Sequence, residues 1–177
     1  MYHERQKKMF CGIHSVNNFL QRKTYTKEIF DSIAERLFIE SPEKDMYRFN
    51  PHKTAFFGNY DANVVIEALR IEGYSTEWFP KANPEKSLVA VFWEDDVKGV
   101  IVNKPTFWGR HWTCLRKDGS EGISAVYHDS KYAEPVIFGT KELTDEFIQD
   151  TVAQEEDDEF FIVREGVNEN ENGNNDS

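Results

Sequence analysis

The sequence is poor in cysteine and has no long hydrophobic run. Its 177 residues include only two cysteines, Cys11 and Cys114, which are too few for a disulfide framework. No apolar stretch approaches the roughly 20 residues that span a bilayer. The first eight residues are polar and leave no room for the apolar core of a signal peptide. We therefore expect a protein of a reducing compartment, the cytoplasm or the nucleus, without an integral membrane segment.

The sequence also lacks an excess of positive charge. Its formal net charge is −11, from 32 acidic and 21 basic residues. Such a surface repels the phosphates of nucleic acids, and no basic stripe interrupts it. We exclude nucleic acid as a partner and expect partners with basic protein segments.

One domain accounts for the length. A chain of 177 residues with 39% hydrophobic content is sufficient for one well-buried core but not for two ordinary domains. We assign residues 1–165 to a single monomeric domain. The run Asn168 to Asp176 has no apolar side chain, so residues 166–177 are expected to form a disordered tail.

The first half of the chain has the apolar periodicity of helices. The expected helices cover residues 11–20, the stretch between Thr26 and Ser41, and the stretch that Asp61 caps and Gly73 ends. From Tyr74 onward the period shifts to two, which predicts strands over residues 74–79, 88–93, 100–103, 111–116, 125–129 and 160–164. One more helix is expected after Thr140.

This order of elements predicts an α+β fold. An N-terminal helical lobe packs against a mostly antiparallel β-sheet. The cleft between the two lobes is the expected location of a functional site.

Cys11 is the first candidate for a functional residue. Most cysteines on helices are buried as small hydrophobic side chains. Cys11, however, lies in the first turn of a helix whose apolar face is formed by Ile13, Val16, Phe19 and Leu20. Backbone N–H groups at a helix start stabilise a thiolate, by about 0.3 to 1 kcal/mol. The position therefore favours a nucleophile.

Gln6, His111 and Asp129 complete the set of groups that acyl transfer through a thiol requires. His111 begins a predicted strand, Asp129 ends the next, and an antiparallel hairpin brings the two side by side. Gln6 precedes the thiol by five residues and is a candidate oxyanion donor. In isolation, His111 also fits a surface histidine and Asp129 also fits a turn residue.

A zinc site is the main chemical alternative. Cys11, His14, His111 and Cys114 together have the composition of a Cys₂His₂ site. Residues three apart in a strand point to opposite faces of the sheet, however, so His111 and Cys114 cannot easily bind one ion. We expect neither a metal nor a cofactor.

Four motifs occur in a fixed order along the chain. They are His3-Glu4-x-Gln6, Cys11-x-x-His14-x-x-Asn17-Asn18, His111-Trp112 and Asp129-Ser130-Lys131. In this order they resemble the Josephin family of deubiquitinating cysteine proteases. The similarity covers about residues 2 to 164, and Gly58-Asn59-Tyr60-Asp61 resembles the short, single-domain members.

The resemblance implies a papain-like fold and hydrolysis of isopeptide or peptide bonds at the C-terminal glycine of ubiquitin. It implies that Cys11 is the nucleophile, His111 the general base and then acid, Asp129 the group that orients His111, and Gln6 the oxyanion donor. The implied partners are ubiquitin or polyubiquitin chains. Trp108 and Trp112 are candidate walls of a passage for the ubiquitin tail.

Two other functions stay open at this stage. A protein with this fold can bind ubiquitin without cleaving it efficiently. Alternatively, a thiol hydrolase can act on an unrelated acyl substrate. The binding protein would retain ubiquitin without forming a covalent adduct. The hydrolase would have a reactive thiol but no preference for ubiquitin.

Overall fold

The computed structural model describes residues 1–6, 9–53, 59–81, 85–107, 109–154 and 157–166. Trp108 and the predicted tail beyond residue 166 lie outside the described residues.

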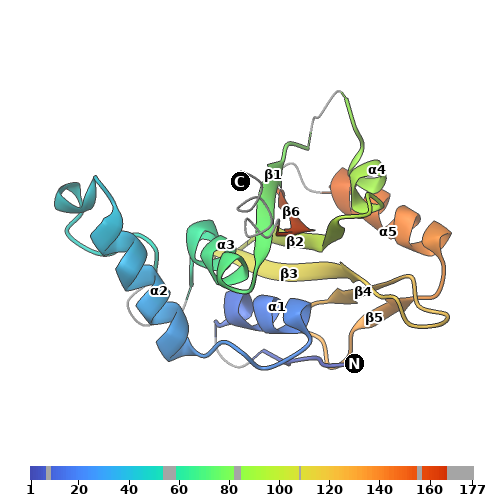
Figure 1. Cartoon of the computed structure of the whole chain (residues 1–177), viewed down its shortest axis with the longest axis horizontal. Coiled ribbons are helices and arrows are strands. Elements are labelled where there is room, and N and C mark those ends of the chain that lie inside the picture. Colours follow the sequence, from blue (N-terminus) through green and yellow to red (C-terminus); the bar gives the residue numbers. More distant parts are fainter. Residues whose placement is uncertain (7–8, 54–58, 82–84, 108, 155–156, 167–177) are drawn as a thin grey trace, which may run out of the picture.

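The described strands form one sheet, in which every neighbouring pair is antiparallel. In spatial order they are β1 (Tyr74–Phe79), β6 (Glu159–Glu165), β2 (Val97–Thr106), β3 (Gly109–Lys117), β4 (Ala125–His128) and β5 (Val136–Phe138). The longest strands, β2 and β3, pair with each other at the centre of the sheet. Figure 1 shows that β1 and β5 lie at opposite edges.

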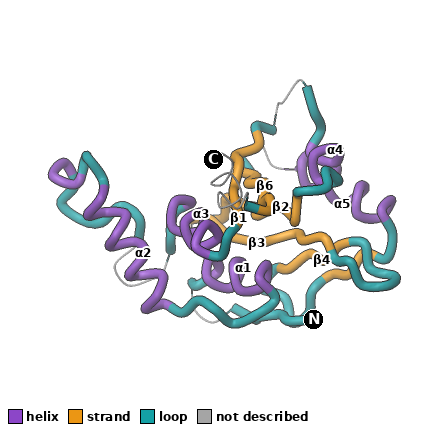
Figure 2. Tube along the Cα trace, viewed as in Figure 1, coloured by secondary structure: helices purple, strands orange, loops and turns teal. Residues whose placement is uncertain are grey.

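Helices cover both faces of this sheet. On one side lie α1 (Cys11–Leu20) and α3 (Ala62–Ile71), with α2 (Lys27–Glu40) packed on α3 and followed by the short 3₁₀ helix η1 (Lys44–Met46). On the other side lie α4 (Leu88–Phe92) and α5 (Lys141–Gln154). In Figures 1 and 2, α1 and α3 lie along the sheet, whereas α2 projects away from the body. No helix in the described ranges is long and apolar enough to cross a membrane.

Strand alternation divides the core into two hydrophobic clusters. Ile101 and Phe161 face the cluster formed with α1, α2 and α3. Their strand neighbours Val100 and Ile162 face the cluster formed with α4 and α5. Successive side chains of a strand point to opposite faces, so a sheet covered on both sides buries both sets. The predicted α+β fold, with N-terminal helices against an antiparallel sheet, is confirmed.

The local signals for the first three helices are also confirmed. The carboxylate of Asp61 accepts a hydrogen bond from the backbone N–H of Val64 at 3.2 Å and caps α3. Gly73 follows α3 with a φ of +85°, which favours glycine over residues with a side chain. Thr26 occupies the N-cap position of α2, but its side chain makes no capping hydrogen bond there.

In the second half of the chain one expected strand and one expected strand end were wrong, and one strand was not expected. Residues 88–93 do not form a strand, because Leu88–Phe92 is the short helix α4, whose first turn is capped by the hydroxyl of Ser87 at 3.1 Å from the N–H of Ala90. Strand β5 was not predicted, since its three residues are too few to show alternation. In addition, β4 ends at His128, so Asp129 is the first residue after the strand.

Candidate active site

Cys11 is the first residue of α1, as the sequence predicts. The helix start has no side-chain cap and no acidic residue in its first turn, so its N–H groups are available to an anion at the thiol. The next residue, Gly12, faces Trp112 closely: a Cβ atom there would lie 3.4 Å from the indole ring. Close packing against β3 therefore fixes the first turn of α1 on the sheet.

His111 and Asp129 lie together beside this helix start. Imidazole Nε2 of His111 is 2.7 Å from Oδ1 of Asp129, and both residues are buried. The register of the β3–β4 hairpin explains the contact. Cys114 pairs with His128, so Asp129 follows opposite Thr113 and reaches diagonally to His111.

The electrostatics of this pair favour a charged imidazole beside a carboxylate. Burial by itself lowers the pKa of His111, but its hydrogen bond with Asp129 and its interaction with the Cys11 thiol outweigh it, and the pKa is raised above its ordinary value. Burial raises the pKa of Asp129, but the hydrogen bonds from His111 and from the backbone of Lys131 lower it below its ordinary value. The site can thus hold an imidazolium next to the thiol.

Gln6 reaches the same site from the N-terminal segment. Its backbone N–H donates to the carbonyl oxygen of Ser130 at 2.6 Å. Its side-chain Oε1 accepts from the hydroxyl of Ser130 at 3.3 Å. Gln6 and Cys11 line one cavity, so the structure brings together a thiol, an imidazole and a side-chain amide, with Asp129 behind the imidazole.

This cavity is the space in which a substrate could meet the thiol. It has a volume of about 540 Å³ and is lined by Gln6, Met9, Cys11, Asn59, Thr106, Arg110, His111 and Lys131. A second cavity of about 440 Å³ shares Asn59 and Arg110 with it. Trp112 contributes to the second cavity and is also a core residue, since it is 3% exposed and its indole N–H donates to the carbonyl of Tyr60 at 3.2 Å.

Sequence reasoning did not single out Arg110. Its guanidinium donates to the carbonyl oxygens of Asn103 at 2.7 Å and Asp157 at 2.9 Å and pairs with Glu159. These contacts tie the start of β3 to the segment that leads into β6, directly before His111. The only sequence signal was its position next to the histidine, because its partners are distant along the chain.

The second cysteine has a different environment. Cys114 is fully buried in the cluster beneath α1, and burial raises the pKa of its thiol to about 12. Within the described ranges, no group of three or more His, Cys, Asp or Glu side chains is arranged to hold a metal ion. Cys114 therefore has the properties of a small core residue.

Comparison with known proteins places the chain in a family. Residues 6–164 match the family model named Josephin. The chain belongs to the Josephin family. It is 31% identical to human Josephin-2 over 182 residues, which cover 96% of this chain and 89% of the human protein. Its α+β architecture is consistent with the papain-like fold of that family.

Two further relatives share the Josephin name. A Josephin-like protein of Arabidopsis thaliana is 36% identical over 152 residues, which cover 78% of this chain and 41% of the plant protein. A Josephin-like protein of Drosophila melanogaster is 30% identical over 180 residues, which cover 92% of this chain and 73% of the fly protein. The chain thus spans less than half of the plant relative but most of the human one.

Proposed function

We propose that this chain is a cysteine-type deubiquitinase that cleaves isopeptide or peptide bonds at the C-terminal glycine of ubiquitin. The observation that carries the proposal is the single cavity shared by Cys11, His111 and Gln6, with Asp129 hydrogen-bonded to His111. Membership of the Josephin family supports the choice of a ubiquitin-linked bond over other acyl substrates.

The geometry suits nucleophilic catalysis in two steps. The Cys11 thiolate attacks the carbonyl carbon of the last glycine of ubiquitin. The carbonyl oxygen becomes an anion, which the side-chain amide of Gln6 and the backbone N–H of Cys11 stabilise. As the intermediate collapses, the carbon–nitrogen bond breaks and the imidazolium of His111 gives its proton to the leaving amine. His111 then takes a proton from water as the water attacks the thioester. The carbon–sulfur bond breaks, which releases the carboxyl group of ubiquitin and restores the Cys11 thiolate beside the imidazolium of His111.

Asp129 has an orienting role in this scheme. It binds Nε2 of His111, so Nδ1 is the ring nitrogen left for proton exchange at the thiol. A buried carboxylate in this place also stabilises the imidazolium form that pairs with the thiolate.

The adjoining cavity is suited to the extended tail of ubiquitin. It shares Asn59 and Arg110 with the thiol cavity, and Asp61 and Glu159 are among its lining residues. Lys53 and Arg110 line the same cavity, and Glu159 pairs with Arg110, so the lining offers the tail polar groups of both charges beside the cavity that holds Cys11. Trp112 forms part of the wall.

Turnover of ubiquitin with a fluorophore amide-linked to its C-terminal glycine tests the proposal. The wild-type protein should release the fluorophore, and Cys11→Ala should not, while Cys114→Ala should retain the activity. Binding of ubiquitin to Cys11→Ala is measured in parallel by titration calorimetry. Binding of ubiquitin to Cys11→Ala together with no turnover by the wild type would instead make the chain a ubiquitin-binding module.

A further inference from the structure

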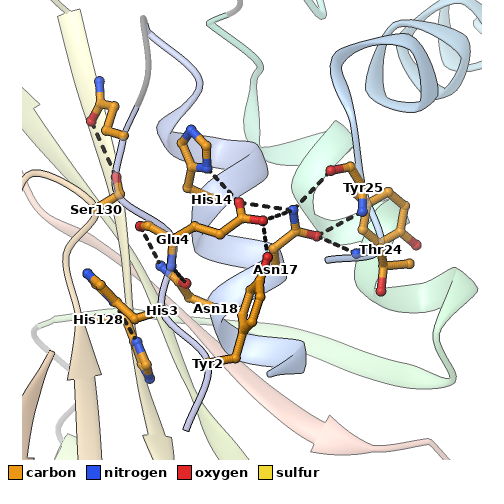
Figure 3. A network of polar contacts seen from close by, with 11 residues as sticks. Tyr2, His3, Glu4, His14, Asn17, Asn18, Thr24, Tyr25, His128 and Ser130 are labelled. Atoms are coloured by element: carbon orange, nitrogen blue, oxygen red, sulfur yellow. Dashed lines mark hydrogen bonds and ion pairs between the residues drawn. The ribbon is translucent and has the colours of Figure 1, made fainter. Parts of the chain in front are cut away.

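The N-terminal segment that carries Gln6 is anchored first on α1. The carboxylate of Glu4 accepts hydrogen bonds from Nδ1 of His14 at 2.6 Å and from Nδ2 of Asn17 at 3.1 Å. The backbone N–H of Glu4 donates to Oδ1 of Asn18 at 2.5 Å. Figure 3 shows the Glu4 side chain directed at these residues of α1. The backbone two residues before Gln6 is therefore held on the helix that carries the thiol.

The second anchor lies on the sheet side of the site. Ser130 is 2% exposed, and it makes two hydrogen bonds with Gln6. Its carbonyl oxygen accepts from the backbone N–H of Gln6 at 2.6 Å, and its hydroxyl donates to Oε1 of Gln6 at 3.3 Å. The first contact fixes the backbone of Gln6, while the second acts only on its side-chain amide.

The second contact holds the side-chain amide of Gln6 with its oxygen at Ser130. A glutamine amide has an oxygen that accepts and a nitrogen that donates, and rotation about its last bond exchanges their places. An oxyanion requires the donor, and the oxygen in its place would repel it. In the structure the oxygen lies at the hydroxyl of Ser130, so Nε2, the donor, is at the end of the amide directed away from Ser130.

We propose that Ser130 is a positioning residue for Gln6, which sets the orientation of its amide for the oxyanion. The inference rests on the proposed function. Asp129 and Ser130 are consecutive, so one turn after β4 orients both the base, through Asp129, and the oxyanion donor, through Ser130. No covalent step passes through Ser130, and it touches no reacting atom.

This role differs measurably from a general structural one. Removal of the hydroxyl leaves the backbone contact between Gln6 and Ser130 and the anchors of Glu4 in place. The segment then stays bound, and the side-chain amide loses the restraint that the hydroxyl supplies. The expected loss is in kcat, by about 3- to 10-fold, the range for one neutral hydrogen bond, while KM changes less than about twofold.

A double-mutant cycle tests the assignment. Steady-state turnover of the ubiquitin–fluorophore amide is measured for wild type, Ser130→Ala, Gln6→Ala and the double variant. If Ser130 acts through Gln6, Ser130→Ala lowers kcat in the wild-type background and causes no further loss in Gln6→Ala. Equal losses in both backgrounds, or no loss in the wild-type background, would overturn the inference.

A matched pair of variants separates the hydroxyl from packing. Ser130→Thr keeps the hydroxyl donor, and Ser130→Val has nearly the shape of the Thr variant but no hydroxyl. The Thr variant should therefore retain most of the wild-type kcat, and the Val variant should show the same loss as Ser130→Ala. Equal rates for the two would also overturn the inference. Ser124→Ala, just before β4, serves as the control and should leave kcat unchanged. Wild-type protein without turnover would contradict the proposed function as well, whereas normal turnover with an inert Ser130 contradicts only its role.

Discussion

His111 Nε2 lies 2.7 Å from Oδ1 of Asp129, and the backbone N–H of Lys131 donates to that same oxygen at 2.9 Å. The carboxylate is thus held by the turn that carries it and by the imidazole that it orients. Both side chains are buried, so water competes little for either hydrogen bond. The contact therefore fixes the ring plane of His111 beside Cys11.

Removal of the Asp129 carboxylate should shift the pH dependence of turnover. Burial lowers the pKa of His111, but the hydrogen bond with Asp129 and the interaction with the Cys11 thiol raise it above the ordinary value. In Asp129→Ala one of the raising contacts is gone, so His111 should lose its proton at lower pH. The alkaline limb of the kcat/KM profile should then move to lower pH, and the maximum should fall.

Asp129→Asn is the matched control for this prediction. It keeps an oxygen that can accept from His111 but removes the charge, so its alkaline limb should lie between those of wild type and Asp129→Ala. Profiles with the same alkaline limb in all three proteins would show that Asp129 does not set the protonation of His111.

Loss of the Gln6 side chain should mainly slow the chemical step. Gln6→Ala is expected to lower kcat by about 10² to 10³, the usual loss for one oxyanion donor, with a much smaller change in KM. Arg5→Ala, an exposed neighbour in the same segment, is the control. A loss of less than about tenfold in Gln6→Ala would remove Gln6 from the oxyanion site.

The two cysteines should differ in reactivity towards iodoacetamide. Cys11 lines a cavity although it is only 4% exposed, whereas Cys114 is fully buried and lines none of the described cavities, and burial raises the pKa of its thiol to about 12. Because the thiolate is the reactive form, the native protein should take up one alkyl group, at Cys11. Both cysteines should react in denaturant. Peptide mapping that finds Cys114 modified in the native protein would contradict the structure.

Glu67 should contribute a pH-dependent part of the stability. Its side chain is hydrogen-bonded to Arg70 at 2.6 Å and also contacts Arg36. The hydrogen bond with Arg70 has the largest effect and lowers the pKa of Glu67. Burial opposes it, and the hydrogen bond with Arg36 lowers the pKa further, to about 2 from an ordinary 4.5. The stabilisation is present above the ordinary value and is lost as the pH falls towards about 2.

Glu67→Gln tests this contribution by chemical denaturation. If the whole lowering of the Glu67 pKa counted as stability, it would add at most about 3 kcal/mol to the free energy of unfolding. Solvent around the two arginines screens the pairs, so a loss nearer 1 kcal/mol is expected at neutral pH. The difference from wild type should shrink in acid, whereas Glu121→Gln, at an exposed residue, should show little effect. A difference that grows in acid would contradict the assignment.

The sequence predicted those parts of the fold whose signals are local. The helix over residues 11–20 follows from its apolar periodicity, and α3 follows from the Asp61 cap and Gly73. The prediction of a strand over residues 88–93 was wrong because a short, buried apolar run fits a strand and a helix equally well. Only the Ser87 cap indicates the helix. Strand β5 exists through its pairing with β4, which no short window contains.

The candidate site shows the same limit. Cys11, His111, Asp129 and Gln6 were recognised from their ordered motifs, and the structure brings them together, while their catalytic roles stay predictions. Ser130 and Arg110 were not assigned a role, because the partner of each is distant in the sequence. Ser130 contacts Gln6, and Arg110 contacts Asp157.

Covalent capture is the most direct test of the central claim, that Cys11 attacks the carbonyl at the C-terminus of ubiquitin. Ubiquitin that carries a propargyl amide in place of its last glycine is incubated with wild type, Cys11→Ala and Cys114→Ala, and intact mass and peptide mapping are measured. We predict one adduct in wild type and in Cys114→Ala, located at Cys11, and none in Cys11→Ala. An adduct in Cys11→Ala, or none in the folded wild type, would contradict the claim.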